Sequence, residues 1–174
     1  MNIKEILKNL IPPILHPSTI KNYYTNLIKD KDRFEYEKNF YTRHSFILRA
    51  IFNKSNNSNY LEIGVSDGDV FNTIPLPLKN KYGVDPLKGG THRTTSDNFF
   101  KNNKVFFDVI FIDGLHTYEQ CKEDFLNSIK FLKEDGIIIL HDLLPKNSME
   151  QQVPRKSYIW NGDVWKLGVE ISKS

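Results

Sequence analysis

The sequence predicts an α/β fold in which helices cover a mostly parallel β-sheet. Four short apolar runs carry this prediction: NYLEIG, KYGVD, VFFDVIFID and GIIILHD. Such near-continuous apolar runs are typical of strands that are buried on both faces, as in parallel sheets. The segments between the runs have room for helices, and this alternation of strands and helices indicates βαβ units.

The composition is that of one globular domain. The chain has 174 residues, 39% of them hydrophobic, and a net charge of +3 with Lys and Arg scattered among Asp and Glu. A nucleic-acid surface would need clustered basic residues, so we expect no nucleic-acid partner. The single cysteine, Cys121, cannot form an internal disulfide, which fits a reducing compartment such as the cytoplasm.

Residues 1–57 are predicted to be an N-terminal helical extension of a core over residues 58–174. Helix-like apolar spacing also covers residues 41–52. The first apolar stripe consists of Ile3, Ile6, Leu7 and Leu10. Lysines, asparagines and two prolines interrupt this stretch, so we expect no stable membrane insertion and a cytoplasmic location. A short amphipathic helix lying on a membrane surface is the alternative.

Further helices are predicted between and after the strands. A short helix fits between Asp85 and Val105, and a longer one ends between Lys133 and Gly136. The apolar face predicted for the longer helix consists of Tyr118, Cys121, Phe125, Ile129 and Leu132. Asp163 is the expected N-cap of a last helix, VWKLGVEI, and no clear pair of strands follows. The sheet is therefore expected to be abbreviated at its C-terminal end.

The first strand end and the second together indicate a nucleoside site. The strand over NYLEI turns through Gly64 and Gly68, and Asp85 follows the next strand about twenty residues later, where an acid can bind ribose hydroxyls. The glycine spacing does not match a dinucleotide fingerprint, because position 66 is serine. These features predict a nucleoside without phosphates; two ordinary turns are the alternative.

The third and fourth strand ends carry a second group of polar residues. Asp113 and His116 follow one strand, and His141 and Asp142 end the next. Thr117 and Gln120 have the spacing of a capping box, which places the helix start after His116. If the two strands are neighbours, Asp113 and Asp142 can bind one metal ion. An imidazole with a pKa near 6.5 can serve as a general base; a loop histidine and a sheet histidine without catalytic roles are the alternatives.

The motifs YLEIGVSDG, GVDP, FDVIFIDGLHTYEQCKEDF, GIIILHDLLP and WNGDVWK resemble those of class I S-adenosylmethionine-dependent methyltransferases. The most similar group is the bacterial methyltransferases of sugars, glycans and macrolides. The resemblance covers about residues 58–166 and implies a Rossmann-like fold with S-adenosyl-L-methionine as cofactor. It assigns cofactor binding to Glu62, Gly64, Gly68, Asp85, Ser96 and Asp113. Ser96 and Asp97 resemble residues near the adenine, and a helix-capping role for Ser96 is the alternative.

The resemblance also implies the chemistry at the acceptor end. It gives catalytic roles to His116, Asp113 and His141. Related enzymes hold Mg²⁺ on acids equivalent to Asp113 and Asp142, but several carry a second Asp or Asn where this chain has Leu143. The tail segment from Trp160 to Trp165 is either a lid over the acceptor or a packing element.

Three functions are consistent with these residues. The first is O-methylation of a hydroxyl on a sugar or other small-molecule acceptor, with His116 as base. The second is a non-catalytic methyltransferase-like binding module that needs a partner. The third is a metal enzyme that does not use the nucleoside. The short tail also predicts a homodimer in which a partner protomer completes the site.

Overall fold

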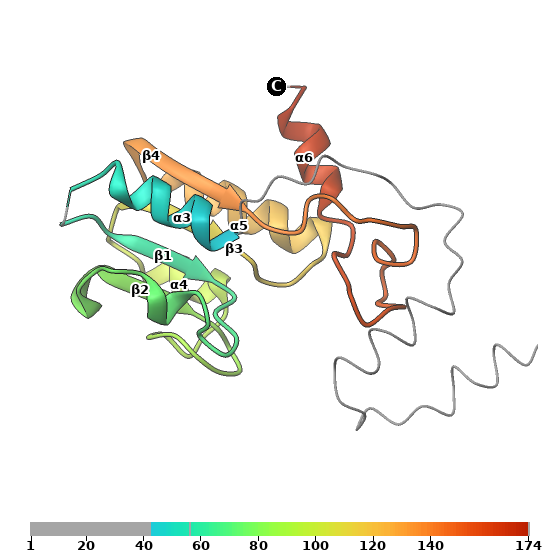
Figure 1. The fold of residues 1–174 in the computed structure, drawn as a ribbon, viewed down its shortest axis with the longest axis horizontal. Coiled ribbons are helices and arrows are strands. Elements are labelled where there is room, and N and C mark those ends of the chain that lie inside the picture. The colour runs from blue at the N-terminus through green and yellow to red at the C-terminus, as the bar shows by residue number, and fades with distance from the viewer. Residues whose placement is uncertain (1–42, 56, 174) are drawn as a thin grey trace, which may run out of the picture.

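The structure is a computed structural model that describes residues 43–55 and 57–173, and its centre is a parallel β-sheet (Figure 1). The strands are β1 (Tyr60–Ile63), β2 (Lys81–Val84), β3 (Phe107–Ile112) and β4 (Leu132–Leu140). The helices are α3 (Arg43–Phe52), α4 (Ser96–Asn102), α5 (Tyr118–Lys130) and α6 (Trp165–Ile171), with short 3-10 turns η1 (Phe71–Thr73) and η2 (Leu78–Asn80). This architecture confirms the predicted α/β fold.

The strand order positions the functional site. The four strands run in the order β2-β1-β3-β4, and all three pairings are parallel. The chain steps from β1 to one side and then returns past β1 to β3, so the winding reverses between β1 and β3. In open parallel sheets, ligands bind at this reversal, beyond the carboxyl ends of the strands.

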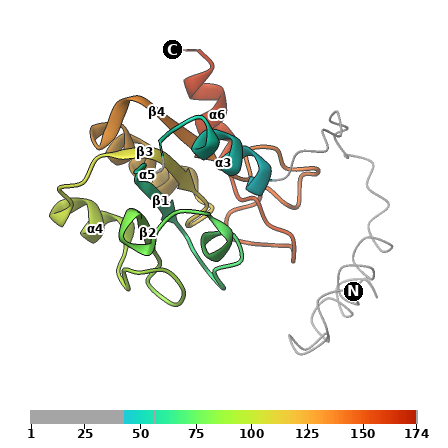
Figure 2. The same cartoon turned by 60° about the vertical axis from the view of Figure 1, so that its left-hand side comes forward.

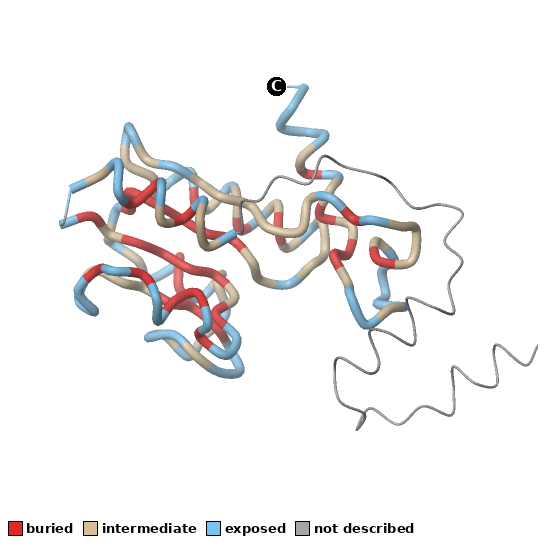
Figure 3. Tube along the Cα trace, viewed as in Figure 1, coloured by how far each residue is buried: buried red, intermediate tan, exposed pale blue. Residues whose placement is uncertain are grey.

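Helices cover both faces of the sheet (Figures 1 and 2). On one face, Ile47 and Ile51 of α3 pack in one cluster with Tyr60 of β1 and Phe111 of β3. A second cluster on the other face combines residues of α4, α5 and α6 with the alternate side chains of the strands. All residues of β1 and β3 are buried, as the tube along β1 in Figure 3 illustrates.

The end of α5 differs from the prediction. The helix ends at Lys130 and β4 begins at Leu132, so the expected helix end between Lys133 and Gly136 is wrong. The Phe131 carbonyl accepts the Phe107 N–H at 2.9 Å, which already pairs this segment with β3. The pairing then shifts register before Ile137, and the polar residues of the early strand occupy this irregular stretch.

Two further helix predictions need correction. Ile129 is 49% exposed, whereas Asp124 and Ser128 are buried on the inner face of α5, so the face is more polar than expected. Asp163 does not cap α6, because its Oδ1 accepts the Tyr118 N–H at the start of α5, at 2.7 Å. The tail is thereby fixed to the loop between β3 and α5.

The last part of the predicted extension belongs to the folded core. Helical spacing over residues 41–52 is confirmed for the described part, because α3 begins at Arg43 and its inner side packs on the sheet. The stripe Ile3, Ile6, Leu7 and Leu10 lies outside the described residues. Within the described ranges, every helix is too short or too polar to cross a bilayer.

Candidate functional site

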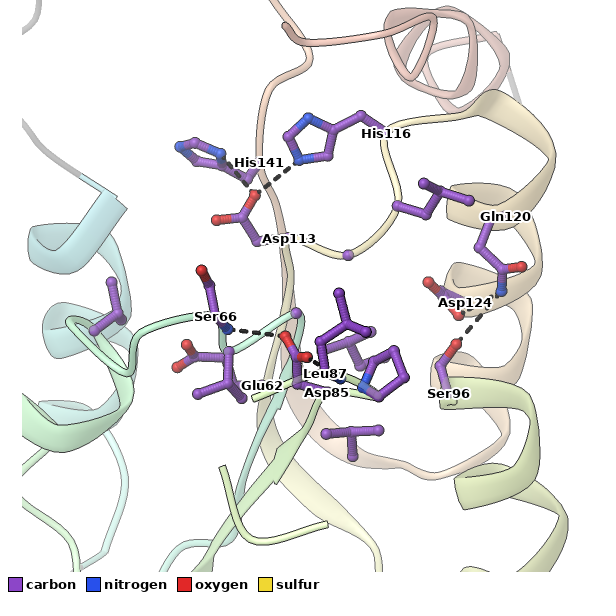
Figure 4. Close-up of a pocket in the computed structure, with 18 of the residues that line it drawn as sticks. Glu62, Ser66, Asp85, Leu87, Ser96, Asp113, His116, Gln120, Asp124 and His141 are labelled. Carbon is purple, nitrogen blue, oxygen red and sulfur yellow. Dashed lines mark hydrogen bonds and ion pairs between the residues drawn. The ribbon is translucent and has the colours of Figure 1, made fainter. Parts of the chain in front are cut away.

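A cavity of about 760 Å³ lies beyond the carboxyl ends of all four strands (Figure 4). Its walls come from the loops after the strands, the start of α4, the first turns of α5 and Arg43 of α3. Eight of its lining residues are acidic: Glu62, Asp67, Asp69, Asp85, Asp97, Asp113, Asp124 and Asp142. The cavity therefore suits a ligand that carries positive charge.

The glycine turn after β1 brings two strand ends into contact. Gly64 has a φ of +84°, and a Cβ there would lie 2.0 Å from the carbonyl oxygen of Asp113. Only glycine fits at this position. The turn at Gly64 thus runs directly against the backbone after β3. Gly68 also has a φ of +84° and lies close to the Asn72 side chain.

Asp85 holds the same turn from the end of β2. Its Oδ2 accepts the Ser66 N–H at 2.9 Å, and its Oδ1 accepts the N–H groups of Leu87 and Lys88 at 2.8 and 3.0 Å. Burial alone would raise the pKa of Asp85, but these backbone donors outweigh it and lower the pKa. A carboxylate has about four acceptor positions. The turn therefore uses three of them, and one on Oδ2 remains for a ligand hydroxyl.

Glu62 lines the cavity from inside β1 and is 2% exposed. Its Oε2 accepts the hydroxyl of Tyr60 at 2.6 Å. Burial raises the pKa of Glu62 to about 7, although the Tyr60 bond opposes this rise. Glu62 is therefore a buried carboxyl whose charge responds to what binds beside it.

One end of the cavity lies between α4 and α5 (Figure 4). Gln120 Nε2 donates to Ser96 Oγ at 3.4 Å and to Asp97 and Asp124 at 3.3 and 3.1 Å. Thr95, not Ser96, caps α4, so the capping alternative for Ser96 is wrong. Ser96 lies in the lining of the cavity.

The predicted capping box at the start of α5 is half confirmed. Thr117 accepts the N–H of Gln120 at 3.4 Å, and α5 begins at Tyr118, directly after this cap. The side chain of Gln120 does not reach back to Thr117, because it bonds the residues of α4 and Asp124 instead.

Asp113 lies at the centre of the other end of the cavity (Figure 4). Its Oδ1 is 3.2 Å from His116 Nε2 and 3.1 Å from His141 Nδ1, while its Oδ2 is 3.0 Å from Arg43. Asp142 contacts the same two imidazoles at 3.3 and 3.2 Å. Because β3 and β4 are neighbours, Asp113 and Asp142 converge as the sequence predicted.

The charged groups in this cluster shift the pKa values of their neighbours. Burial alone would raise the pKa of Asp113, but bonds from His116 and His141 lower it to about 2. Burial opposes the charged form of His141, and the two carboxylates outweigh this effect and raise its pKa to about 9. The pKa of His116 is also raised. The unperturbed pKa near 6.5 that the sequence suggested does not hold for either imidazole in this cluster.

The tail holds His116 in place. The Trp160 carbonyl lies 2.8 Å from His116 Nδ1, and the two rings pack with centroids 5.6 Å apart. A Cβ at Gly162 would lie 1.6 Å from the His116 carbonyl oxygen, so the tail backbone runs directly against this loop. Trp160 therefore orients a site residue from behind, a role nearer to the packing alternative than to a lid.

Arg43 and Asp124 are site residues that the sequence reasoning missed. The sequence pattern could have indicated Asp124, because this residue falls on the same helical face as Cys121 and a buried acid on that face needs a hydrogen-bond partner. No pattern in the sequence indicates Arg43, because the contact with Asp113 joins residues 70 positions apart.

A comparison with protein families matches residues 79–143, which run from η2 through β4, to a family described as "Methyltransferase domain". No curated protein matched the sequence. The family match, which covers less than half of the chain, supports a methyltransferase, and the parallel sheet is consistent with a Rossmann-like methyltransferase fold.

Proposed function

We propose that this protein is an S-adenosylmethionine-dependent methyltransferase that methylates a hydroxyl group of a sugar or another small molecule. The observation that carries the proposal is that one acidic cavity joins two groups of residues. The glycine turn after β1 and Asp85 after β2 form the first group, and the histidine–carboxylate cluster after β3 and β4 forms the second. The family match to a methyltransferase domain covers both β2 and β3.

The residues present fit S-adenosylmethionine. When bound, it supplies a methyl group on a positively charged sulfonium, which the eight lining carboxylates favour. The remaining acceptor position of Asp85 suits a ribose hydroxyl, and Ser96, which lines the cavity at α4, is proposed to contact the base. Glu62, Gly64, Gly68 and Asp113 are the residues proposed to hold the methionine side of the molecule.

His116 is the proposed base for the acceptor hydroxyl. With Nδ1–H donated to the Trp160 carbonyl, Nε2 is the nitrogen proposed to take the acceptor proton. For this step the acceptor hydroxyl has to take the place that Asp113 Oδ1 holds beside Nε2. Asp113 and Asp142 contact this imidazole and balance the positive charge that it gains, and His141 contacts the same two carboxylates. General-base catalysis of this kind contributes roughly 10² to 10⁴-fold in rate.

A divalent cation is a further part of the proposal. Donor atoms of Asp113, His141 and Asp142 all lie within 4.8 Å of one another. The two distances from His141 Nδ1, 3.1 and 3.2 Å, are close to the roughly 3.0 Å between adjacent ligands of an octahedral ion. A bound cation would lower the pKa of an acceptor hydroxyl. With one nitrogen ligand, this set suits Mn²⁺ or Zn²⁺ at least as well as Mg²⁺.

Titration calorimetry with S-adenosylhomocysteine tests the cofactor site. We expect micromolar binding by the wild-type protein and at least tenfold weaker binding by Asp85→Ala. Asp67→Ala is the matched control, because Asp67 lines the same cavity but its side chain is 69% exposed. Thermal melting of both variants separates lost binding from lost folding. No binding by the wild-type protein, with Mg²⁺, Mn²⁺ or chelator, would contradict the proposal.

Replacement of His116 distinguishes an enzyme from a binding module. We expect His116→Gln to bind S-adenosylhomocysteine within about threefold of wild type and to lose roughly 10² to 10⁴-fold in methyl transfer to a panel of sugars. Equal turnover by both proteins would remove His116 from the mechanism. Cofactor binding with no turnover by the wild-type protein on any acceptor would favour the non-catalytic module.

A further inference from the structure

Arg43 is the one Arg or Lys that lines the cavity, as far as the described residues go. It comes from α3, which lies before the segment that matches the family model. Every other charged side chain of the lining, apart from the two imidazoles, is a carboxylate. A guanidinium inside such an acidic wall points to a ligand group that the acids would repel.

The position of Arg43 distinguishes the two ends of the cavity. Its guanidinium is 3.0 Å from Oδ2 of Asp113, whereas Oδ1 of Asp113 faces His116 and His141. The charge of Arg43 also lowers the pKa of the buried Glu62, although burial dominates there and raises it. Arg43 therefore reaches the cavity beside Asp113 at the end of β3, through the carboxylate oxygen that neither imidazole contacts.

The guanidinium of Arg43 has N–H donors that the bond to Asp113 does not use. Arginine carries five N–H donors in a planar fork that matches a carboxylate, and the bond to Asp113 uses one nitrogen. The Arg43 side chain is 41% exposed, so a ligand in the cavity can reach it.

We propose that Arg43 binds the α-carboxylate of the methionine part of S-adenosylmethionine. This inference rests on the proposed function. The sulfonium and the ammonium of that molecule are cations that the acidic wall attracts, and its single carboxylate is the one group that needs a cation. Arg43 contacts Asp113 and lines the cavity together with Glu62, two of the residues proposed to hold the methionine side, and it supplies that charge.

Two ligands that differ only at the methionine end provide the test. S-adenosylhomocysteine carries the amino-acid group, and 5′-methylthioadenosine lacks it but keeps the nucleoside and the sulfur. By titration calorimetry we expect Arg43→Gln to weaken S-adenosylhomocysteine roughly ten- to a hundredfold and to leave 5′-methylthioadenosine within about twofold. Arg43→Lys should recover part of the loss. Arg49→Gln removes the same charge from α3 outside the cavity lining and should change neither affinity.

The outcomes separate this inference from the proposed function. Equal weakening of both ligands by Arg43→Gln would overturn the inference, because Arg43 would then only support the cavity through Asp113. Unchanged binding of S-adenosylhomocysteine by Arg43→Gln would overturn it as well. If the wild-type protein binds neither ligand, the proposed function itself is wrong.

Discussion

Asp124 is an acid that the fold keeps almost fully buried. It is 1% exposed and receives a hydrogen bond from Gln120, and burial raises its pKa from 3.8 to about 6. As pH rises from about 4 to about 6, the unfolded chain loses this proton before the folded protein does. Stability therefore falls over this window, and the loss is complete above it, at up to about 3 kcal/mol.

We therefore expect Asp124→Asn to unfold at a higher temperature than the wild type at pH 7.5, with a smaller difference at pH 4.5. An amide keeps the acceptor for Gln120 and has no charge to bury. Glu123→Gln on the same helix is the control, because Glu123 is exposed. Differential scanning calorimetry at both pH values measures the effect. A gain of the same size at both pH values would contradict the explanation from ionisation.

Cys121 packs in the core instead of serving as a nucleophile. It is 5% exposed, and burial raises the pKa of its thiol to about 12. Because the thiolate is the reactive form, we expect the native protein to react with Ellman's reagent far more slowly than the guanidinium-unfolded chain. The absorbance of released thionitrobenzoate follows both reactions. Equal rates in the two states would show that this part of α5 opens readily.

At the residue scale, the sequence located the strand-end residues well. Asp113, His116, His141 and Asp142 could be found because a parallel sheet brings the ends of neighbouring strands to one edge. Their protonation could not be predicted, since it depends on distances of about 3 Å between residues far apart in the chain. Arg43 could not be found for the same reason.

At the element scale, the turn after β1 depends on Gly64. A Cβ at this position would lie 2.0 Å from the Asp113 carbonyl oxygen and 2.5 Å from its carbon, both of which are backbone atoms. We expect Gly64→Ala to destabilise the fold by at least about 2 kcal/mol, because both the left-handed φ and the contact oppose a side chain. Urea unfolding measures the change.

The matched control is a glycine in a different environment. Gly168 lies inside α6, and a Cβ there would make ordinary contacts of 3.6 Å with Leu143. Alanine is favoured over glycine in a helix, so we expect Gly168→Ala to be neutral or to stabilise by about 0.5–1 kcal/mol. A loss of stability in Gly168→Ala similar to that in Gly64→Ala would contradict the explanation from the backbone contact and the left-handed φ at Gly64.

Boundaries between elements were less predictable than the elements themselves. The end of α5 was placed too late, because Leu132 continues the apolar spacing of the helix although it belongs to β4. Asp163 has the sequence features of an N-cap, but it binds the start of α5 instead. In both cases a contact distant in sequence decides between two local possibilities that look alike.

At the scale of the whole molecule, β4 forms an edge of the sheet in the part of the chain that the structure describes. Within the described residues β4 pairs with β3 alone, and Ile137 on this strand is 37% exposed. The His141 N–H bonds to the Ile112 carbonyl, so alternate backbone groups of β4 point away from β3. An unpaired edge of this kind can pair with another strand.

We expect the chain to form a homodimer through antiparallel pairing of β4 with its copy, which is the simplest closed arrangement of two identical edges. Sedimentation velocity at increasing protein concentration should show a species of twice the chain mass. Ile137→Lys should shift it toward the monomer, because a charged residue disfavours edge pairing. Ile129→Lys, at an exposed position on α5, should leave the dimer intact. A monomer at every concentration, or equal dissociation in both variants, would mean that β4 is not the contact surface.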